Sequence, residues 1–270
     1  MSFYETLKQI WSKNDSLVCV GLDPDLSRIP GHLFETKNPI FEFNRAIIDA
    51  TADLVCAYKP QFAHYAAEGA EAQLAMTIDY IHEAYPGVPV ILDAKRGDIG
   101  STAKMYAKEA FDRYRADAVT VNPFLGGDSL TPFLENKDKG VVLLCRTSNP
   151  GARDIQDLEV NGRKLYQVIA HKASYEWNYN SNVLLVVGAT YPEELKEIRY
   201  IVGDMPLLVP GIGAQGGDIE AAVRNGLDSN GAGMIINSSR GIIYAGTGPA
   251  FALAAREATE ALRNEINRFR

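Results

Sequence analysis

Short apolar runs recur along the whole chain, and they constrain its fold more than any other feature. Eight such runs occupy residues 16–21, 54–58, 88–92, 116–121, 140–145, 182–187, 207–209 and 233–236. A strand that is apolar throughout its length is typical of a parallel sheet covered by helices. We therefore expect eight parallel strands.

Segments in which apolar residues recur with helical spacing separate these runs. They cover residues 41–51, 71–85, 101–113, 164–175, 192–201, 219–225 and 249–266. Eight strand–helix repeats in 270 residues predict a single (β/α)8 barrel, with a doubly wound open sheet as the alternative. Residues 3–13 are expected to form an extra N-terminal helix that plugs the barrel floor. Residues 149–163 are interpreted as a long polar loop, and with no linker in the sequence we expect one domain spanning residues 1–270.

The composition and charge of the chain argue against several classes of protein. It is 46% hydrophobic and 23% charged, as in a globular domain, and no apolar run approaches the roughly 20 residues that cross a bilayer. A net charge of −7 argues against a nucleic-acid or anionic-membrane partner. The first residues lack the features of a signal peptide, and Cys19, Cys56 and Cys145 lie in apolar runs, so we expect reduced core thiols and a cytoplasmic location. Neither the cysteines nor the scattered histidines have metal-ligand spacing, so no metal site is predicted.

Charged side chains follow the second and third apolar runs. Lys59 ends the second run, and Asp93, Lys95 and Asp98 follow the third. Alternate residues of a strand point the same way, which groups Asp93 with Lys95, and Gly97 lets the chain turn back toward Asp98. Consecutive strands of a barrel pair, so Lys59 would lie beside Asp93. The pattern predicts a catalytic array of alternating charge; a structural ion pair, or a solvent-facing Lys59, is the alternative interpretation.

A glycine-rich loop follows the seventh run, and a basic loop follows the eighth. Residues 209–218 read Val-Pro-Gly-Ile-Gly-Ala-Gln-Gly-Gly-Asp, whose backbone N–H groups can hold a phosphate, and residues 237–241 include the permanent cation of Arg240. These two loops form the usual phosphate site of phosphate-binding barrels, so we predict a phosphorylated substrate, although glycines also serve simply to turn a chain. Asp23 suits sugar hydroxyls, and Thr147, Ser148 and Asn149 suit a polar heterocycle; ordinary turns are the alternative for both.

Taken together, these separated motifs resemble the orotidine 5′-phosphate decarboxylase family in its longer bacterial form, over essentially the whole chain. The most specific is Asp-x-Lys-x-x-Asp-Ile at residues 93–99, with an upstream lysine. The resemblance implies conversion of orotidine 5′-monophosphate to uridine 5′-monophosphate and CO2, the last step of de novo UMP synthesis, without a metal or organic cofactor. The matching motifs are Val20-Gly21-Leu22-Asp23, Tyr58-Lys59-Pro60-Gln61, residues 93–99 with Thr102, Thr147-Ser148-Asn149, residues 209–217 and Ser239-Arg240.

The resemblance also implies roles for individual residues. Lys95 would stabilise the carbanion formed at C6 of the substrate and then protonate it, because no adjacent π system delocalises that charge. Asp93 would lie near the departing carboxylate, and Lys59 with Asp98 would hold the array. Family members are homodimers, in which residues matching Asp98 and Thr102 reach the neighbouring site. The other implied substrate contacts are Asp23, Ser148, Pro210, Gly213, Gln215, Gly217 and Arg240.

Two other functions are compatible with the motifs. Related barrels such as hexulose-phosphate synthase and 3-keto-gulonate 6-phosphate decarboxylase share a similar Asp-x-Lys-x-x-Asp element but use Mg²⁺. The presence of Lys59 in place of an acidic metal ligand argues against them. The other alternative is a non-catalytic nucleotide-binding barrel. Burying such an array of charges costs free energy, and a protein that only binds a nucleotide has no need of it, which argues against this alternative.

Overall fold

Parallel strands close into a barrel in the computed structural model, which describes residues 1–212 and 218–270. The described residues form an eight-stranded sheet in the order β2-β1-β10-β9-β8-β5-β4-β3. Bridges from Tyr58 to Val90 and from Gln61 to Asp93 join its two outer strands, so the sheet is closed. The barrel prediction is therefore confirmed, and the doubly wound alternative is wrong. The strands are β1 (Val18–Leu22), β2 (Ala57–Pro60), β3 (Ile91–Arg96), β4 (Ala118–Val121), β5 (Gly140–Arg146), β8 (Val183–Val187), β9 (Leu207–Pro210) and β10 (Met234–Ser238).

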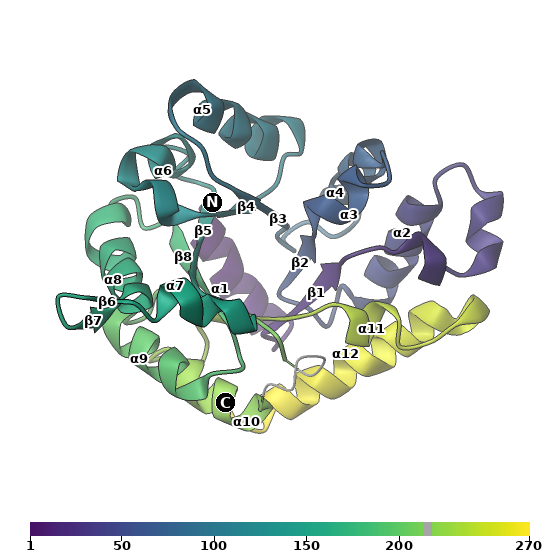
Figure 1. Cartoon of the computed structure of the whole chain (residues 1–270). Helices are drawn as coiled ribbons and strands as arrows, with labels where there is room; N and C mark the ends of the chain where they lie inside the picture. The colour runs from purple at the N-terminus through teal and green to yellow at the C-terminus, as the bar shows by residue number, and fades with distance from the viewer. Residues whose placement is uncertain (213–217) are drawn as a thin grey trace.

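Helices surround the strands, as Figure 1 shows. Each of the helical segments expected from the sequence contains one. The segments 101–113 and 164–175 are divided, because π-helical turns at Glu109–Arg113 and Ala173–Trp177 follow α5 and α8. The helices are α1 (Phe3–Lys13), α2 (Pro39–Thr51), α3 (Phe62–Ala66), α4 (Glu71–Ala84), α5 (Gly100–Lys108), α6 (Gly127–Leu134), α7 (Arg153–Gln156), α8 (Leu165–Lys172), α9 (Pro192–Val202), α10 (Ile219–Gly226), α11 (Arg240–Ile243) and α12 (Phe251–Asn267).

The fold differs from the sequence prediction in the short helices α3 and α11, which were not expected, in α6 and in the segment 149–163. Helix α6 was missed, because Pro132 lies inside it and a proline normally ends a helix. The segment 149–163, expected as a loop, contains α7 and one strand of an antiparallel hairpin that pairs β6 (Glu159–Val160) with β7 (Arg163–Lys164). These elements are short and exposed for most of their length, so they carry no apolar periodicity that the sequence could reveal.

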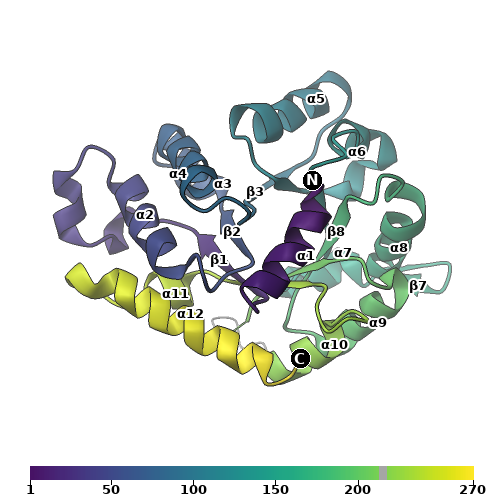
Figure 2. The ribbon, with the colours of Figure 1, turned by 180° about the vertical axis from the view of Figure 1, so that it is seen from behind.

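The N-terminal helix α1 covers the floor of the barrel, as expected. Its first backbone N–H donates to the carbonyl of Asp138, which precedes β5, and Asn14 Nδ2 donates to the carbonyl of Val55, which precedes β2. Phe3 packs so closely on Gly140 that a Cβ there would lie 2.5 Å from the Phe3 ring. Figure 2 shows α1 lying across the N-terminal ends of the strands. The opposite, C-terminal ends therefore form the open mouth.

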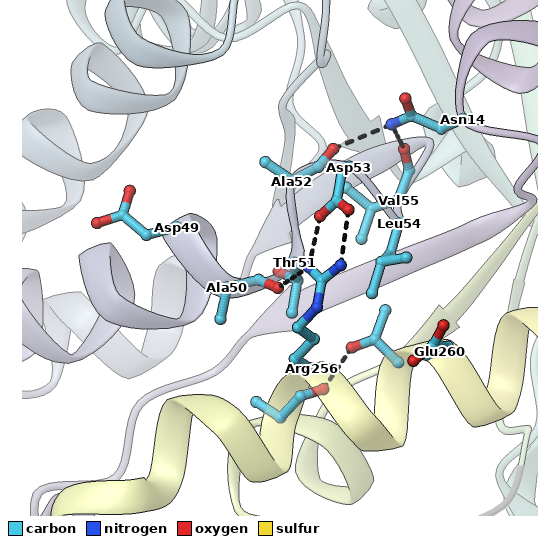
Figure 3. Close-up of polar contacts among 12 residues, drawn as sticks. Asn14, Asp49, Ala50, Thr51, Ala52, Asp53, Leu54, Val55, Arg256 and Glu260 are labelled. Atoms are coloured by element: carbon cyan, nitrogen blue, oxygen red, sulfur yellow. Dashed lines mark hydrogen bonds and ion pairs between the residues drawn. The ribbon is translucent and has the colours of Figure 1, made fainter.

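The last helix, α12, packs against α2 and completes the helical ring. Arg256 donates to both carboxylate oxygens of Asp53 (2.7 and 2.8 Å), which lies just beyond the C-terminal end of α2. It also donates to the carbonyl of Ala50 (2.8 Å), in the last turn of that helix (Figure 3). Figure 3 also shows Asn14 holding the same turn from the other side through the carbonyl of Ala52 (3.0 Å). These contacts fix the approach of the chain to β2, which carries Lys59.

No helix in the described part of the chain is long and apolar enough to cross a membrane. Cys19, Cys56 and Cys145 are free and buried, as expected.

Candidate active site

Lys59, Asp93 and Lys95 meet at the mouth of the barrel. Asp93 binds both lysines: its Oδ2 lies 2.9 Å from Lys59 Nζ and its Oδ1 lies 2.6 Å from Lys95 Nζ. Lys59 and Asp93 are buried, whereas 47% of the Lys95 side chain is exposed. The closing of β3 against β2 brings these groups together, as the sequence predicted.

An irregularity in β3 directs the Lys95 side chain. The register between β3 and β4 shifts between Leu92 and Arg96, and Lys95 adopts a φ of 45°. This left-handed backbone conformation is uncommon for a residue with a side chain, and such conformations concentrate at functional sites. A bulge of this kind turns a side chain away from the regular alternation of the strand. The ion pair between Asp93 and Lys95 lies within this irregular stretch of β3.

Neutral donors complete the surroundings of Asp93. Thr120 Oγ1 donates to its Oδ1 (2.8 Å), and Gln61 Nε2 donates to its Oδ2 (3.1 Å). The backbone N–H of Lys95 donates in turn to Thr120 Oγ1 (2.9 Å). Asp23 Oδ1 lies 4.0 Å from Lys59 Nζ on the other side. The sequence analysis gave no role to Thr120; the available signal was a polar residue inside the apolar run 116–121.

Mutual pairing keeps the buried groups ionised. Burial alone would lower the pKa of Lys59, but the carboxylates of Asp93 and Asp23 outweigh it and raise the pKa above its ordinary value. Burial alone would raise the pKa of Asp93, but the ammonium groups of Lys59 and Lys95 outweigh it and hold the pKa well below its ordinary value. Near neutral pH both members of the Lys59–Asp93 pair therefore carry charge.

Two adjoining cavities open at this array. One of about 500 Å³ extends toward β5, and one of about 190 Å³ extends toward β9 and β10. Lys59, Asp93 and Pro210 line both, so the charged groups lie where the cavities meet. The larger cavity is also lined by Lys95, Thr120, Leu144, Thr147, Ser148, Asn149, Gln156, Val186 and Leu208, and the smaller by Asp23, Gln61, Gly211, Ile212, Asn237, Ser238, Ser239 and Arg240.

A buried arginine anchors the loop that carries Ser148. Arg146 ends β5 and donates through Nε and Nη2 to the two carboxylate oxygens of Glu194 (2.8 and 3.2 Å). Beside it, Gln156 accepts from the backbone N–H of Thr147 (2.9 Å) and donates to the Thr147 hydroxyl (2.9 Å). The segment 147–157 therefore folds back so that Gln156 lines the larger cavity. The sequence analysis missed Gln156 because it lies in a polar stretch without periodicity.

The remaining predicted site residues lie elsewhere. Asp98 is half-buried and accepts a hydrogen bond from the backbone N–H of Ile99 (2.8 Å), and Thr102 is exposed on α5. In the described part of the chain neither lines the two cavities, so within one chain the array holds Lys59, Asp93 and Lys95. Gly213, Gln215 and Gly217 lie outside the described residues. Residues 1–212 and 218–270 contain no group of three or more histidine, cysteine, aspartate or glutamate side chains placed to hold a metal ion.

Comparison with known proteins agrees with the motifs. The model of the "Orotidine 5′-phosphate decarboxylase / HUMPS family" matches residues 16–255. The chain belongs to this family. It is 62% identical over 270 residues to "Orotidine 5′-phosphate decarboxylase" of Ralstonia pickettii, covering the whole of both chains. Among solved structures, Leishmania donovani OMP decarboxylase is 40% identical with a TM-score of 0.88, covering 100% of this chain and 99% of that one.

A second solved structure, Leishmania donovani UMP synthase, is longer than this family member. It is 42% identical with a TM-score of 0.90, and the match covers 100% of this chain but 56% of that one. The resemblance found in the motifs is therefore confirmed at the level of the family and of the fold.

Proposed function

We infer that this chain is an orotidine 5′-phosphate decarboxylase, which converts orotidine 5′-monophosphate to uridine 5′-monophosphate and CO2 in the last step of de novo UMP synthesis. The observation that carries this conclusion is the Lys59–Asp93–Lys95 array at the junction of two cavities. It occurs in a chain with 62% identity to a full-length relative of that name.

The two cavities suit the two ends of a nucleotide. We assign the phosphate to the smaller cavity, where Arg240 supplies a forked cation beside the mouth of β10. Pro210 lines this cavity, and the predicted contacts Gly213, Gln215 and Gly217, which follow it in the sequence, lie outside the described residues. The base would lie in the larger cavity near Ser148.

The ribose would lie between the two ends, where Asp23 can accept hydrogen bonds from its hydroxyls. Asp23 lines the smaller cavity close to Lys59. Its backbone carbonyl accepts a hydrogen bond from the Tyr244 hydroxyl (3.2 Å), which helps to hold the loop after β1. The reacting C6 would then face the charged array at the junction.

The charged array suits the loss of CO2 from C6. The bond between C6 and the carboxylate carbon breaks, its electron pair stays on C6, and CO2 leaves. The Lys95 ammonium stabilises that electron pair electrostatically and then transfers a proton from Nζ to C6, giving the product and a neutral amine that regains a proton from water. Asp93 holds the ammonium at 2.6 Å and lies near the departing carboxylate, while Lys59 holds Asp93 from the other side.

We further propose that the active site is completed in a homodimer, with Asp98 and Thr102 serving the neighbouring subunit. Both residues are on or next to the start of α5, and in the described part of the chain they do not line the two cavities at the charged array. The same region exposes large apolar side chains on α5 and on the turns after β3 and β4, namely Ile99, Met105, Phe124 and Leu125. Apolar groups exposed together in this way are typical of a surface that another protein covers.

We also propose that residues 1–270 act as one catalytic domain in the cytoplasm. One cluster of buried hydrophobic residues extends from Phe3 to Ile266, which supports a single folding unit. The free, buried thiols of Cys19, Cys56 and Cys145 are typical of a reducing compartment.

The test is ultraviolet-monitored conversion of orotidine 5′-monophosphate by the purified protein in EDTA, with Lys95→Ala and Arg240→Ala as variants. We expect metal-independent turnover in the wild type, no turnover in Lys95→Ala, and in Arg240→Ala a KM raised roughly tenfold to a hundredfold by loss of a charge-assisted hydrogen bond. A wild-type protein that needs Mg²⁺, or is inactive as a folded dimer, would contradict the proposal. Near-normal turnover by Lys95→Ala would overturn the role of Lys95.

A further inference from the structure

Thr120 connects the two ends of the Lys95 residue. Its hydroxyl accepts from the Lys95 backbone N–H (2.9 Å) and donates to Asp93 Oδ1 (2.8 Å), the same oxygen that lies 2.6 Å from Lys95 Nζ. The hydrogen bonds form a closed ring from the lysine backbone through Thr120 and Asp93 to the lysine ammonium. Thr120 is 1% exposed, so its side chain is almost completely shielded from solvent.

We propose that Thr120 is a positioning residue for the decarboxylation, which fixes the backbone of Lys95 and the carboxylate of Asp93 so that the ammonium lies beside C6. This inference rests on the proposed function. Thr120 acts through Lys95 and Asp93 and needs no contact of its own with the reacting atoms.

The irregular backbone of β3 explains why a hydroxyl is needed at this position. The ladder between β3 and β4 pairs Leu92 with Val119 and then Arg96 with Val121, so Lys95 lies in the interval where the register shifts. Its N–H donates to the Thr120 side chain instead of a strand carbonyl. Because Lys95 has a φ of 45°, which is unfavourable for a residue with a Cβ, an external hydrogen bond has to maintain that conformation.

Loss of the hydroxyl should lower kcat more than it raises KM. The phosphate is assigned to Arg240 and the base to the part of the larger cavity near Ser148. Thr120 also lines that cavity, but its hydroxyl bonds to Lys95 and Asp93, so the position of the Lys95 ammonium depends on it. Nearly half of the Lys95 side chain is exposed, so other lysine conformations in solvent are accessible once its backbone and its carboxylate partner are released. A displacement of about 1 Å of a catalytic group can cost on the order of a hundredfold in rate.

The test compares Thr120→Val, which keeps the shape and removes the hydroxyl, with Thr120→Ser, which keeps the hydroxyl and removes a buried methyl group. We expect Thr120→Val to lose roughly tenfold to a hundredfold in kcat with KM changed less than about threefold. Thr120→Ser should keep kcat within about threefold of the wild type, although it lacks the methyl group. A residue with a purely structural role would show no such dependence on the hydroxyl.

Three measurements separate the possible outcomes. Thermal melting and calorimetric binding of uridine 5′-monophosphate show whether each variant is folded with an intact nucleotide site. If Thr120→Val does not fold, Thr120→Ala against Thr120→Ser gives the same comparison, because both lack the methyl group. Equal kcat in the variants with and without the hydroxyl would overturn the inference while leaving the proposed function intact; wild-type inactivity in the same assay would instead reject the proposed function.

Discussion

Two forked arginine–carboxylate pairs in this chain have similar geometry and different burial, so they should contribute differently to stability. Arg146 binds Glu194 at 2.8 and 3.2 Å, and its side chain is 0% exposed. Arg256 binds Asp53 at 2.7 and 2.8 Å, and its side chain is 38% exposed (Figure 3). Replacement of each arginine by methionine keeps much of the aliphatic volume and removes the charge.

The expected losses follow from what each replacement leaves behind. Arg256→Met releases Asp53 and the carbonyl of Ala50 to water, so we expect a loss of about 1 kcal/mol in the free energy of unfolding. Arg146→Met leaves the carboxylate of Glu194 and that of Asp157, 3.3 Å from Arg146, without their buried cation. Breaking a buried pair from one side costs about 3 to 5 kcal/mol. The difference between the variants should therefore be about 2 to 4 kcal/mol.

Urea denaturation of the wild type and both variants, at one protein concentration, measures this difference. Steady-state kinetics give an independent readout, because Arg146 anchors the segment that carries Ser148 and Gln156 to the larger cavity. We expect Arg146→Met to raise KM for orotidine 5′-monophosphate and Arg256→Met to leave it unchanged. Equal losses of stability in the two variants would refute the argument from burial, and an unchanged KM in Arg146→Met would refute the anchoring role.

Two further predictions concern the charged array and the base site. Lys59→Met should lower the free energy of unfolding by about 3 kcal/mol, and by the same amount throughout about pH 5 to 9. The pKa of Asp93 is depressed, so its contribution to stability is lost only in acid, below the ordinary pKa of an aspartate. The pKa of Lys59 is raised, so its contribution to stability is lost only in strong alkali. Urea titrations in which the stability difference between the wild type and Lys59→Met changes within that pH window would contradict this. Gly188→Ala places a Cβ 2.9 Å from Ser148 Cβ and 3.0 Å from its backbone nitrogen, so Ser148 has to shift and KM should rise about tenfold, the equivalent of one hydrogen bond; an unchanged KM in a folded variant would show that Ser148 makes no contact with the base.

The sequence alone determined the barrel and most of its charged array. Apolar runs such as 116–121 and 182–187 can be buried only as strands covered by helices, and their order along the chain leaves few topologies. Lys59, Asp93 and Lys95 were predictable as neighbours because every parallel strand of a barrel ends at the same mouth. That inference needs only the end of each strand, which local patterns supply.

Tertiary structure alone decided how those groups are held. The ring through Thr120 depends on the register between β3 and β4, and a shift of one residue would turn that hydroxyl away from Asp93. The form of the segment 149–163 depends on hydrogen bonds of Arg146 and Gln156. Glu194, the partner of Arg146, is distant in the sequence, and Gln156 lies in a polar stretch without periodicity. The assigned role of Asp98 depends on a second chain. Such contacts arise from packing between elements, and a local pattern of apolar and polar residues does not encode them.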